Sequence, residues 1–413
     1  MPTDVVTAFL RSRGEVLLLR RSDAVGTYRG RWGGVSGYAE GDPDDQVRRE
    51  IAEETGLEDA VEFVRSGRPL QVEDDDRTWR VHPSLFECSS RTVTLSEEHT
   101  DHTWVSPTTI HLGERPCVPG LWAAYERVAP SVRTVAADAD HGADYLSVRA
   151  LEVLRDRAAV LAAAGEDGSD ELADLAERLA SVRPSMAVLR NRIDRAMATA
   201  PSLSAPAVHE ATLAGIDSAV EARAAVAGTL ADQIEGTAMT LSRSGTVLEG
   251  IRQASLDRVY VAESRPDREG VGVAEALAGD VPVTLHTDAA VATILERESV
   301  DIVVVGADTI LPDGAVVNKT GTRGLAIAAA HEDVPVVVAA ARDKVAPTGE
   351  VNLESGTREP VYDGSAALDV ANPTFDVTPA SLVDRVLTEA GPLTDIDAVA
   401  TEHASNASWR SEG

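Results

Sequence analysis

The sequence predicts an α/β protein made of two unlike parts, and three observations support this prediction. Near the N-terminus, the apolar segments VVTAFL and GEVLLLRR indicate two neighbouring strands ahead of a helical run. Residues 145 to about 255 are rich in Ala, Leu, Arg and Glu at helical spacing. From residue 258 on, short β-branched runs alternate with helical ones, which is typical of a parallel sheet with crossover helices.

The N-terminal part is expected to combine strands with a few helices. After the two strands, the segment from Pro43 to Glu54 has helical spacing and ends at Thr55-Gly56, a helix stop signal. A strand-like run ends in Trp104-Val105, and a last helix lies near GLWAAYERVAP. The polar stretch SVRTVAADADHGADY follows, so we place the boundary near residue 135 and the first domain at residues 1–132.

The C-terminal part is expected to span residues 140–400, with a helical subdomain at 140–255 and a sheet domain at 256–400. Four apolar runs in it, RVYVAE, VPVTLH, DIVVVGAD and VPVVVAAA, lack polar alternation. This pattern predicts strands that are buried on both faces. The chain of 413 residues is long enough for two or three domains of ~100–200 residues each.

The composition excludes several classes of partner. A formal net charge of -30 repels nucleic acid phosphates and anionic membranes, so we expect neither as a partner. No run approaches the roughly 18 apolar residues of a membrane-spanning helix, and the N-terminus lacks a basic-then-apolar signal. With only two Cys, at 88 and 117, the chain is expected to be cytoplasmic, in a reducing compartment.

The basic residues have an unusual distribution. Only two of the 38 are Lys, Lys319 and Lys344, and the rest are Arg. Such acid-rich, Lys-poor composition resembles that of proteins from salt-loving archaea, where molar salt screens the carboxylates. A chain that uses Arg almost everywhere has kept an ammonium group at two positions, which suggests that a compact point charge is required there.

The first chemical constellation is a set of three carboxylates. Glu50, Glu53 and Glu54 have the spacing i, i+3 and i+4, which brings them to one face of a helix. Their mutual repulsion would be relieved by a divalent cation, and ligands that are all oxygen suit Mg²⁺ or Mn²⁺. The alternative is a solvated acidic helix in an acidic protein.

The segment Arg49-Glu50-Ile51-Ala52-Glu53-Glu54-Thr55-Gly56-Leu57 matches the ending REUxEExGU, with U aliphatic, and so resembles a Nudix box. The resemblance covers about residues 4–128 and implies a Nudix α/β/α sandwich. It implies that Glu50, Glu53 and Glu54 hold the metal and that Arg49 orients Glu50. It also implies hydrolysis of a nucleoside diphosphate derivative, in which the metal polarises the pyrophosphate and activates water. Glu53 and Glu54 would be catalytic, and Glu97 or Glu98, in LSEEHTDHTWV, is the candidate general base.

This sequence departs from the Nudix pattern in one loop. Gly37 and Arg49 are two residues closer together than in the family, and Gly41 stands where a Glu is expected. Glu40 or Asp42 is expected to substitute for that Glu in the shortened loop. The three helical carboxylates are unaffected by this difference.

The second constellation lies in DIVVVGADTILPDGAVVNKTGTRGLAIAAA. Asp308 follows a buried strand, where ligands of parallel sheets bind. Asn318, Lys319 and the amides around Gly321-Thr322 could hold a phosphate at a helix N-terminus. The alternative is a capping Asp and a surface Lys.

Several motifs occur in the right order for a second resemblance. GADTI and VVNKTGT, with MTLSRSGTV, LHTDAA and NPTFDVTP, are similar to the family of initiation factor 2B α/β/δ subunits, methylthioribose-1-phosphate isomerase and ribose-1,5-bisphosphate isomerase. The resemblance covers about residues 140–395. It implies a helical subdomain, a Rossmann-like domain and a homo-oligomer formed through this part of the chain. It also implies proton transfer by Asp308 and ligand binding by five side chains: Arg183, Ser244, Asn318, Lys319 and Lys344.

The isomerase pattern is broken at one important position. Ser242 stands where these isomerases carry a Cys, Leu241 replaces the usual His, and no Cys follows residue 117. A Ser hydroxyl is far less acidic than a thiol, so the family's Cys-dependent isomerisation is not expected here. The phosphate element Arg-Gly-Ala has its best match in His141-Gly142-Ala143, while Arg183 and Ser185 are candidates for further phosphate contacts.

Two functions follow from these patterns. The first is a Mg²⁺-dependent Nudix hydrolase of an ADP-ribose-like compound, fused to a domain that binds or isomerises a sugar phosphate. The second is a regulatory protein like an initiation factor 2B subunit, which senses a nucleotide or sugar phosphate without catalysis. Ser242 favours binding in the C-terminal part, whereas the intact glutamates favour hydrolysis in the N-terminal part. His99, His102 and His286 are expected to be capped or solvated, and not metal ligands.

Overall fold

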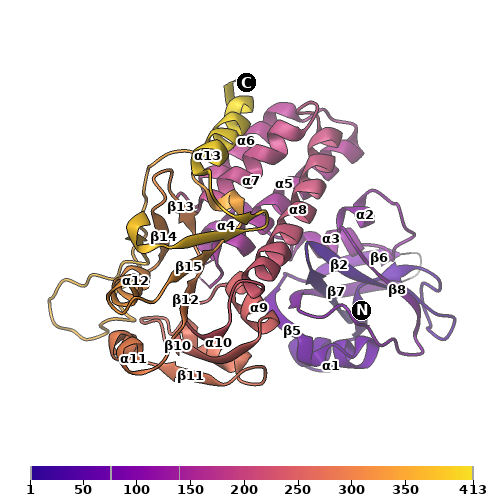
Figure 1. Cartoon of the computed structure of the whole chain (residues 1–413). Helices are drawn as coiled ribbons and strands as arrows, with labels where there is room; N and C mark the ends of the chain where they lie inside the picture. The colour runs from indigo at the N-terminus through magenta and orange to yellow at the C-terminus, as the bar shows by residue number, and fades with distance from the viewer. Residues whose placement is uncertain (1, 75–76, 139, 412–413) are drawn as a thin grey trace. The chain divides into compact units, whose positions relative to one another are not determined.

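The computed structural model describes residues 2–74, 77–138 and 140–411 (Figure 1). By their internal contacts, the residues form two compact units that interleave along the sequence. The first unit comprises Met1–Val135, Arg149–Leu172 and Ala200–Asp217. The second comprises Ala136–Val148, Ala173–Thr199 and Ser218–Gly413.

An eight-stranded mixed sheet forms the centre of the first unit. Its central strands β1 and β7 are parallel, and the other pairs are antiparallel. The strands are β1 (Thr3–Ser12), β2 (Glu15–Arg21), β3 (Trp32–Gly33), β4 (Val35–Tyr38), β5 (Val61–Ser66), β6 (Leu70–Asp74), β7 (Arg77–Cys88) and β8 (His99–Val105).

Helices cover this sheet on both faces, as expected for an α/β/α sandwich. Val47 and Ile51 of α1 (Pro43–Thr55) pack into the apolar core on one face. Helix α3 (Leu121–Glu126), which follows the short α2 (Thr108–His111), contributes Leu121 and Tyr125 to the core on the other. The predicted helix from Pro43 is confirmed: the Asp42 side chain caps its N-terminus, and Gly56, at φ 64°, ends it.

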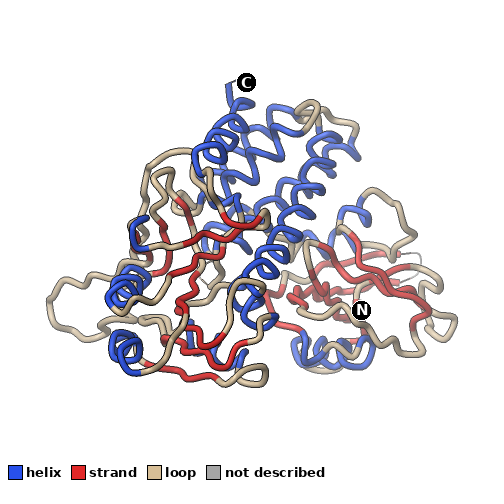
Figure 2. Tube along the Cα trace, in the orientation of Figure 1, coloured by secondary structure: helices blue, strands red, loops and turns tan. Residues whose placement is uncertain are grey.

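Helices dominate the middle of the chain and appear as a blue group in Figure 2. They are α4 (Val132–Ala137), α5 (Ala143–Ala164), α6 (Ser169–Ser181), α7 (Ala187–Thr199) and α8 (Ala205–Ala231). The two units share this segment, since parts of α5 and α8 belong to each. The division of the chain into 1–132 and 140–400 therefore stays a prediction about domains, which the contacts do not follow residue by residue.

The second unit contains a seven-stranded sheet in the order β11-β10-β9-β12-β15-β17-β18. All its pairs are parallel except the last, as the apolar runs predicted. Its strands are β9 (Gly236–Leu241), β10 (Leu256–Ala262), β11 (Val283–His286), β12 (Ile302–Val305), β15 (Val336–Ala339), β17 (Arg385–Thr388) and β18 (Gly391–Pro392). A small antiparallel sheet joins β13 (Thr309–Ile310), β14 (Val316–Lys319) and β16 (Phe375–Thr378).

Helices also cover both faces of the parallel sheet. Residues of α8, α9 (Gly245–Gln253) and α10 (Glu269–Leu277) pack into the core on one face. Residues of α11 (Val291–Arg297), α12 (Thr322–His331) and α13 (Ile396–Asn406) pack into the core on the other. This arrangement is the Rossmann-like layer that the sequence predicted.

One part of the expected layout is wrong. Strand β9 lies within residues 140–255, which were expected to be helical, and it pairs with both β10 and β12 inside the sheet. Its sequence GTAMTL is short and rich in small residues, so the helical pattern on both sides concealed it.

Among the described residues, no helix is both long and apolar enough to span a membrane.

Candidate functional sites

The first candidate site lies between helix α1 and strand β4. The backbone N–H of Ser36 donates a hydrogen bond to Oε2 of Glu54 across 3.1 Å. At the next residue of β4, a Cβ on Gly37 would overlap Oε1 of Glu50. Glycine at this position therefore leaves room for the close approach of the carboxylate to the strand.

Burial and nearby charges raise the pKa of Glu50 and of Glu54. Burial raises the pKa of Glu54, whose residue is 3% exposed, to about 8, and the charges of Glu50 and Glu98 add to this effect. Burial also raises the pKa of Glu50, helped by the nearby charges of Glu53 and Glu98. Three of the carboxylates that were singled out from the sequence are thus close enough to repel one another.

The remaining acidic residues of the site differ in their surroundings. Glu53 points to solvent, although the three helical carboxylates were expected to share one face. The charge of the exposed Glu98 raises the pKa of both Glu50 and Glu54, which distinguishes it from Glu97 as the candidate base.

Within residues 2–74, 77–138 and 140–411, no three His, Cys, Asp or Glu side chains gather closely enough to hold a metal. The metal site formed by Glu50, Glu53 and Glu54 therefore stays a prediction.

His99 lies beside this site, and the expectation that it is capped or solvated is wrong. Its residue is 7% exposed, its Nδ1 is buried without a hydrogen-bond partner among the residues that the structure describes, and its Nε2 lies 4.0 Å from Oε1 of Glu54. Burial lowers the pKa of His99 to about 4, and the charge of Arg21 adds to this effect. A neutral imidazole thus faces a carboxyl group that retains its proton near neutral pH.

Hydrogen bonds define the roles of Arg49, in helix α1, and of Asp42, in the altered loop before that helix. The Arg49 guanidinium contacts Gln46 Oε1 at 3.4 Å, and the Gln46 amide donates to Glu50 Oε1 at 2.7 Å. Arg49 therefore reaches Glu50 through an intermediate amide. The Asp42 side chain accepts from the N–H of Asp44 as the cap of α1, which leaves the exposed Glu40 as the free loop carboxylate.

The second candidate site lies where strands of the parallel sheet end, and we call it the strand-end site. Its members lie after β9, at the start of α10, after β12, at the end of β14 and in a short 3₁₀ turn after β15: Ser242, Glu269, Asp308, Lys319 and Lys344. The Ser242 hydroxyl donates to Oε2 of Glu269 at 2.5 Å, and Lys319 Nζ lies 2.9 Å from its Oε1. Polar groups from separate strands thus meet at the edge where such sheets bind ligands.

The partly buried Asp308 and the buried Lys344 complete the strand-end site. Burial raises the pKa of Asp308 and outweighs the charges of Lys344 and Lys319. Its carboxylate accepts a hydrogen bond from the N–H of Ala143, so the alternative of a capping Asp also holds in part. Lys344 is 7% exposed and donates to the carbonyl of Ala307 at 2.5 Å, and burial lowers its pKa.

Three residues expected to bind ligand are engaged elsewhere. The Ser244 hydroxyl accepts from the N–H of Val247 at 3.3 Å and caps α9. The buried Asn318 amide donates to Thr322 Oγ1 at 3.0 Å, at the start of α12. Arg183 donates to the carbonyl of Asp138 at 2.5 Å. Each of these side chains therefore has a hydrogen-bond partner within the protein, and its binding of a ligand stays a prediction.

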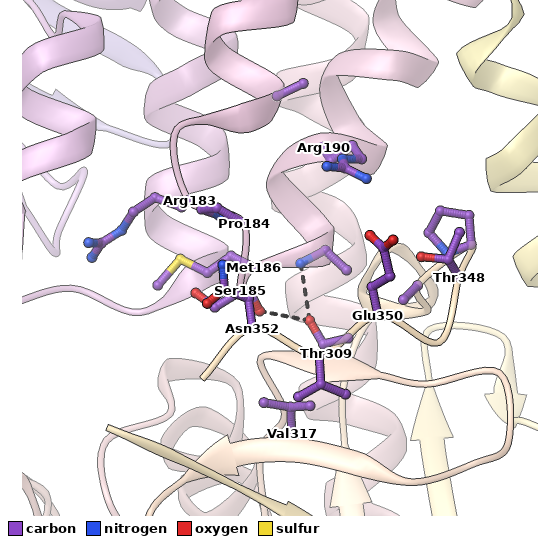
Figure 3. Close-up of a pocket in the computed structure, with 15 residues that line it drawn as sticks. Arg183, Pro184, Ser185, Met186, Arg190, Thr309, Val317, Thr348, Glu350 and Asn352 are labelled. Carbon is purple, nitrogen blue, oxygen red and sulfur yellow. Dashed lines mark hydrogen bonds between the residues drawn. The ribbon is translucent and has the colours of Figure 1, made fainter. Parts of the chain in front are cut away.

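Arg183 instead lines a separate cavity of about 410 Å³ (Figure 3). Thr309 anchors its floor by accepting from the N–H of Ala187 and donating to the carbonyl of Ser185. Thr309 and Val317 are paired across β13 and β14, so their side chains lie on one face of this ribbon. The Ser185 hydroxyl donates to Glu354 at 2.5 Å, so it too is already engaged.

Sequence reasoning missed Glu269, which links Ser242 to Lys319. The available signal was its place shortly after a parallel strand, the rule that had identified Asp308. It also missed the buried Arg192, which pairs with Asp144 at 2.9 Å and Asp343 at 3.0 Å. No sequence motif marks an ion pair formed between distant helices.

Comparison with known proteins relates two successive stretches of the chain to families. Residues 1–121 match the model of the NUDIX domain, and residues 139–395 match that of the Initiation factor 2 subunit family. Methylthioribose-1-phosphate isomerase 1 of Trypanosoma cruzi is 37% identical over 38% of this chain and 48% of its own length. The corresponding isomerase of Methylococcus capsulatus is 40% identical over 41% of this chain and 49% of its own. The chain thus spans about half the length of these curated relatives.

A solved structure has a similar fold. The translation initiation factor eIF-2B of Pyrococcus horikoshii OT3 matches with a TM-score of 0.56 and 29% identity. The match covers 63% of this chain and 94% of that one. Both expected resemblances are confirmed: the chain carries a NUDIX domain, and it belongs to the Initiation factor 2 subunit family.

Proposed function

We propose that the NUDIX domain is a pyrophosphohydrolase that acts with Mg²⁺ or Mn²⁺ on a nucleoside diphosphate derivative resembling ADP-ribose. The observation that carries this proposal is the close approach of two carboxyl groups of α1 to strand β4, where Glu54 accepts from the Ser36 N–H and Glu50 lies against Gly37. A divalent cation fits such a donor set, because hard cations bind carboxylate oxygens and their charge favours the ionised form. Glu50, Glu53 and Glu54 would hold the metal, which when bound polarises the pyrophosphate.

The protein groups have separate tasks in this proposal. The Ser36 N–H and the Gln46 amide fix the orientations of Glu54 and Glu50. Glu98 is exposed on the loop before β8, where it is free to accept a proton from an attacking water. Because its charge acts on both Glu50 and Glu54, the base lies within electrostatic reach of the groups that would hold the metal.

An aromatic cluster supports a nucleoside as the substrate's other part. Tyr38 is adjacent to Gly37 and 55% exposed, and its ring lies 6.4 Å from that of Trp79. The ring of Tyr28 lies 6.3 Å from that of Trp79, and the Tyr28 hydroxyl accepts from the indole N–H of Trp79. The exposed Tyr38 ring offers an apolar face for a nucleobase close to the carboxylate site.

Phosphorus NMR tests the hydrolase with ADP-ribose and Mg²⁺, in molar KCl because of the acidic composition. We expect AMP and ribose 5-phosphate from the wild type, and none from E53Q/E54Q. Glu97→Gln is the matched control, because it removes a neighbouring charge that does not act on Glu50 or Glu54. Cleavage that survives E53Q/E54Q would contradict the proposal.

We further propose that the strand-end site binds a phosphorylated sugar. Lys319 and Lys344 provide the only two ammonium groups among the chain's side chains, and both belong to this site. The regulatory alternative, in which the C-terminal unit senses its ligand without turnover, is favoured by Ser242 at the isomerase Cys position. Titration calorimetry with ribose 1,5-bisphosphate should detect binding that Lys319→Met weakens at least tenfold.

Assembly and location are part of the same proposal. We expect a homo-oligomer formed through the C-terminal unit, in the cytoplasm of a salt-loving organism. Sedimentation in molar KCl would contradict this expectation if the chain were monomeric at every concentration tested.

A further inference from the structure

The Ser242 hydroxyl lacks the acidity of the thiol it replaces. A thiol has a pKa near 8.5, whereas an alcohol ionises only with the help of a neighbouring base. Proton transfer at this position therefore needs a second group. In the strand-end site that second group is in contact: Ser242 Oγ donates to Glu269 Oε2 at 2.5 Å.

The direction of the Ser242 hydroxyl is fixed by its backbone. Ser242 has φ 59°, in the left-handed region that non-glycine residues rarely adopt, and so does Ser264, with φ 61°. The N–H of Ser242 donates to Ser264 Oγ at 2.6 Å, and the N–H of Ser264 donates to Asp288 Oδ1 at 2.8 Å. Such a strained and hydrogen-bonded turn is typical of a functional position.

The orientation of the Glu269 side chain is also fixed by its contacts. It is the first residue of α10, and Lys319 binds its Oε1 at 2.9 Å. The other oxygen, Oε2, is thereby oriented toward Ser242. The side chains of both Glu269 and Lys319 remain about one fifth exposed, at 20% and 19%, so a ligand can reach this group.

We infer that Ser242 and Glu269 form a proton relay that takes the place of the missing thiol in a sugar-phosphate isomerisation. The inference rests on the proposed binding of a phosphorylated sugar at the strand-end site. Ser242 is the group that contacts the substrate, and Glu269 is a positioning residue that acts through it.

The assigned step is the conversion of an enol to a ketone. The enol O–H bond breaks, and its electron pair forms the carbonyl double bond. Ser242 Oγ accepts that proton and releases its own hydroxyl proton to Glu269 Oε2, so the serine stays neutral. The electron pair of the C=C bond takes a proton at the neighbouring carbon from Asp308, whose charge interacts with that of Glu269. Three protons move, one each from the enol, Ser242 and Asp308, which leaves Glu269 protonated and Asp308 ionised, and no oxidant or reductant is consumed.

Three variants test the relay with ribose 1,5-bisphosphate as the probe, by NMR for turnover and by calorimetry for binding. Glu269→Gln keeps the side-chain shape but cannot accept a proton, so kcat should fall about 100-fold while KM changes little. The pH profile of kcat should lose its acidic limb. Glu263→Gln is the matched control, because Glu263 pairs with Arg268 in the same loop at 3.4 Å.

Ser242→Cys distinguishes a relay from a structural role of Glu269. A thiol titrates by itself, so E269Q should cost little in the S242C background if Glu269 acts through Ser242. An equal loss in both backgrounds would overturn the relay. A wild-type protein that binds the probe but does not convert it would also overturn the relay and leave the proposed binding intact. A protein that does not bind the probe would refute both.

Discussion

Ser36 and Glu54 are joined by a hydrogen bond of 3.1 Å from the backbone N–H to Oε2, and this bond ties helix α1 to strand β4. A buried carboxyl that accepts such a hydrogen bond can adopt few other orientations. Its environment also controls its protonation, since burial raises its pKa to about 8. Stability, metal binding and catalysis are therefore expected to depend on the same group.

The free energy of unfolding should depend on pH through Glu54. The carboxyl ionises near 4.5 in the unfolded chain but near 8 in the folded protein. Between these values the folded state binds more protons, so stability should fall as pH rises, by up to roughly 5 kcal/mol for this group. Urea unfolding with EDTA at pH 5 and pH 9 measures the effect. Glu54→Gln should abolish most of it, and equal pH dependence in the variant would contradict the assignment.

Addition of Mg²⁺ should reverse this loss of stability at alkaline pH. A cation that binds the ionised carboxylates competes with the proton, so it stabilises the folded protein more at pH 8 than at pH 5. Thermal unfolding of the wild type with and without Mg²⁺ gives this comparison. If E54Q gains as much as the wild type, the cation binds somewhere else.

Gly37→Ala should impair hydrolysis without unfolding the protein. The added Cβ would occupy the place of Glu50 Oε1, and this flexible side chain must move away. We expect kcat to fall about tenfold or more, with a small change in the unfolding midpoint. Gly26→Ala is the control, since a Cβ there meets no atom within 4 Å. Full activity of G37A would show that the orientation of Glu50 is unimportant.

Glu98→Gln should slow hydrolysis much more than Glu97→Gln. Of these two residues, Glu98 is the one whose charge raises the pKa of Glu50 and Glu54, while both lend their backbone carbonyls to Ser22. A general base contributes about 100-fold or more, so E98Q should lose kcat and the acidic limb of its pH profile. Similar kinetics for the two variants would remove Glu98 from the mechanism.

Ser244→Ala should lower stability and leave ligand affinity nearly unchanged. The hydroxyl caps α9, and loss of such a cap costs about 1 kcal/mol. Ser244→Asn, which can also cap, should recover most of that stability. Calorimetry with the sugar phosphate separates the two roles, since a large loss of affinity in S244A would restore the ligand-binding role expected from the sequence.

The sequence predicts those helices and site residues whose positions are marked by residues close to them along the chain. Helix α1 has its cap at Asp42, Pro43 in its first turn and Gly56 at its end, so it could be placed almost to the residue. Asp308 could be located because it follows an apolar run that ends at a predictable edge of the sheet. Both predictions depend on neighbours in sequence and on general geometry.

Features that depend on distant neighbours could not be predicted. Glu53 and Glu54 are adjacent and chemically identical, yet only Glu54 is buried, because strand β4 covers its side of the helix. Glu269 became visible only when the fold brought it to Ser242 and Lys319. Ser244 stands before a helix, which is also a capping signal, and its hydroxyl does cap α9.

The scarcity of lysine gives the strand-end site an unusual experimental property. A protease that cleaves only after lysine has two target bonds in the chain, and both adjoin this site. Lys344 is 7% exposed and the Lys319 side chain 19%, so both bonds should resist cleavage while the sheet edge is closed. The rate of cutting by such a protease therefore reports local opening of the site itself, without a label or an engineered residue.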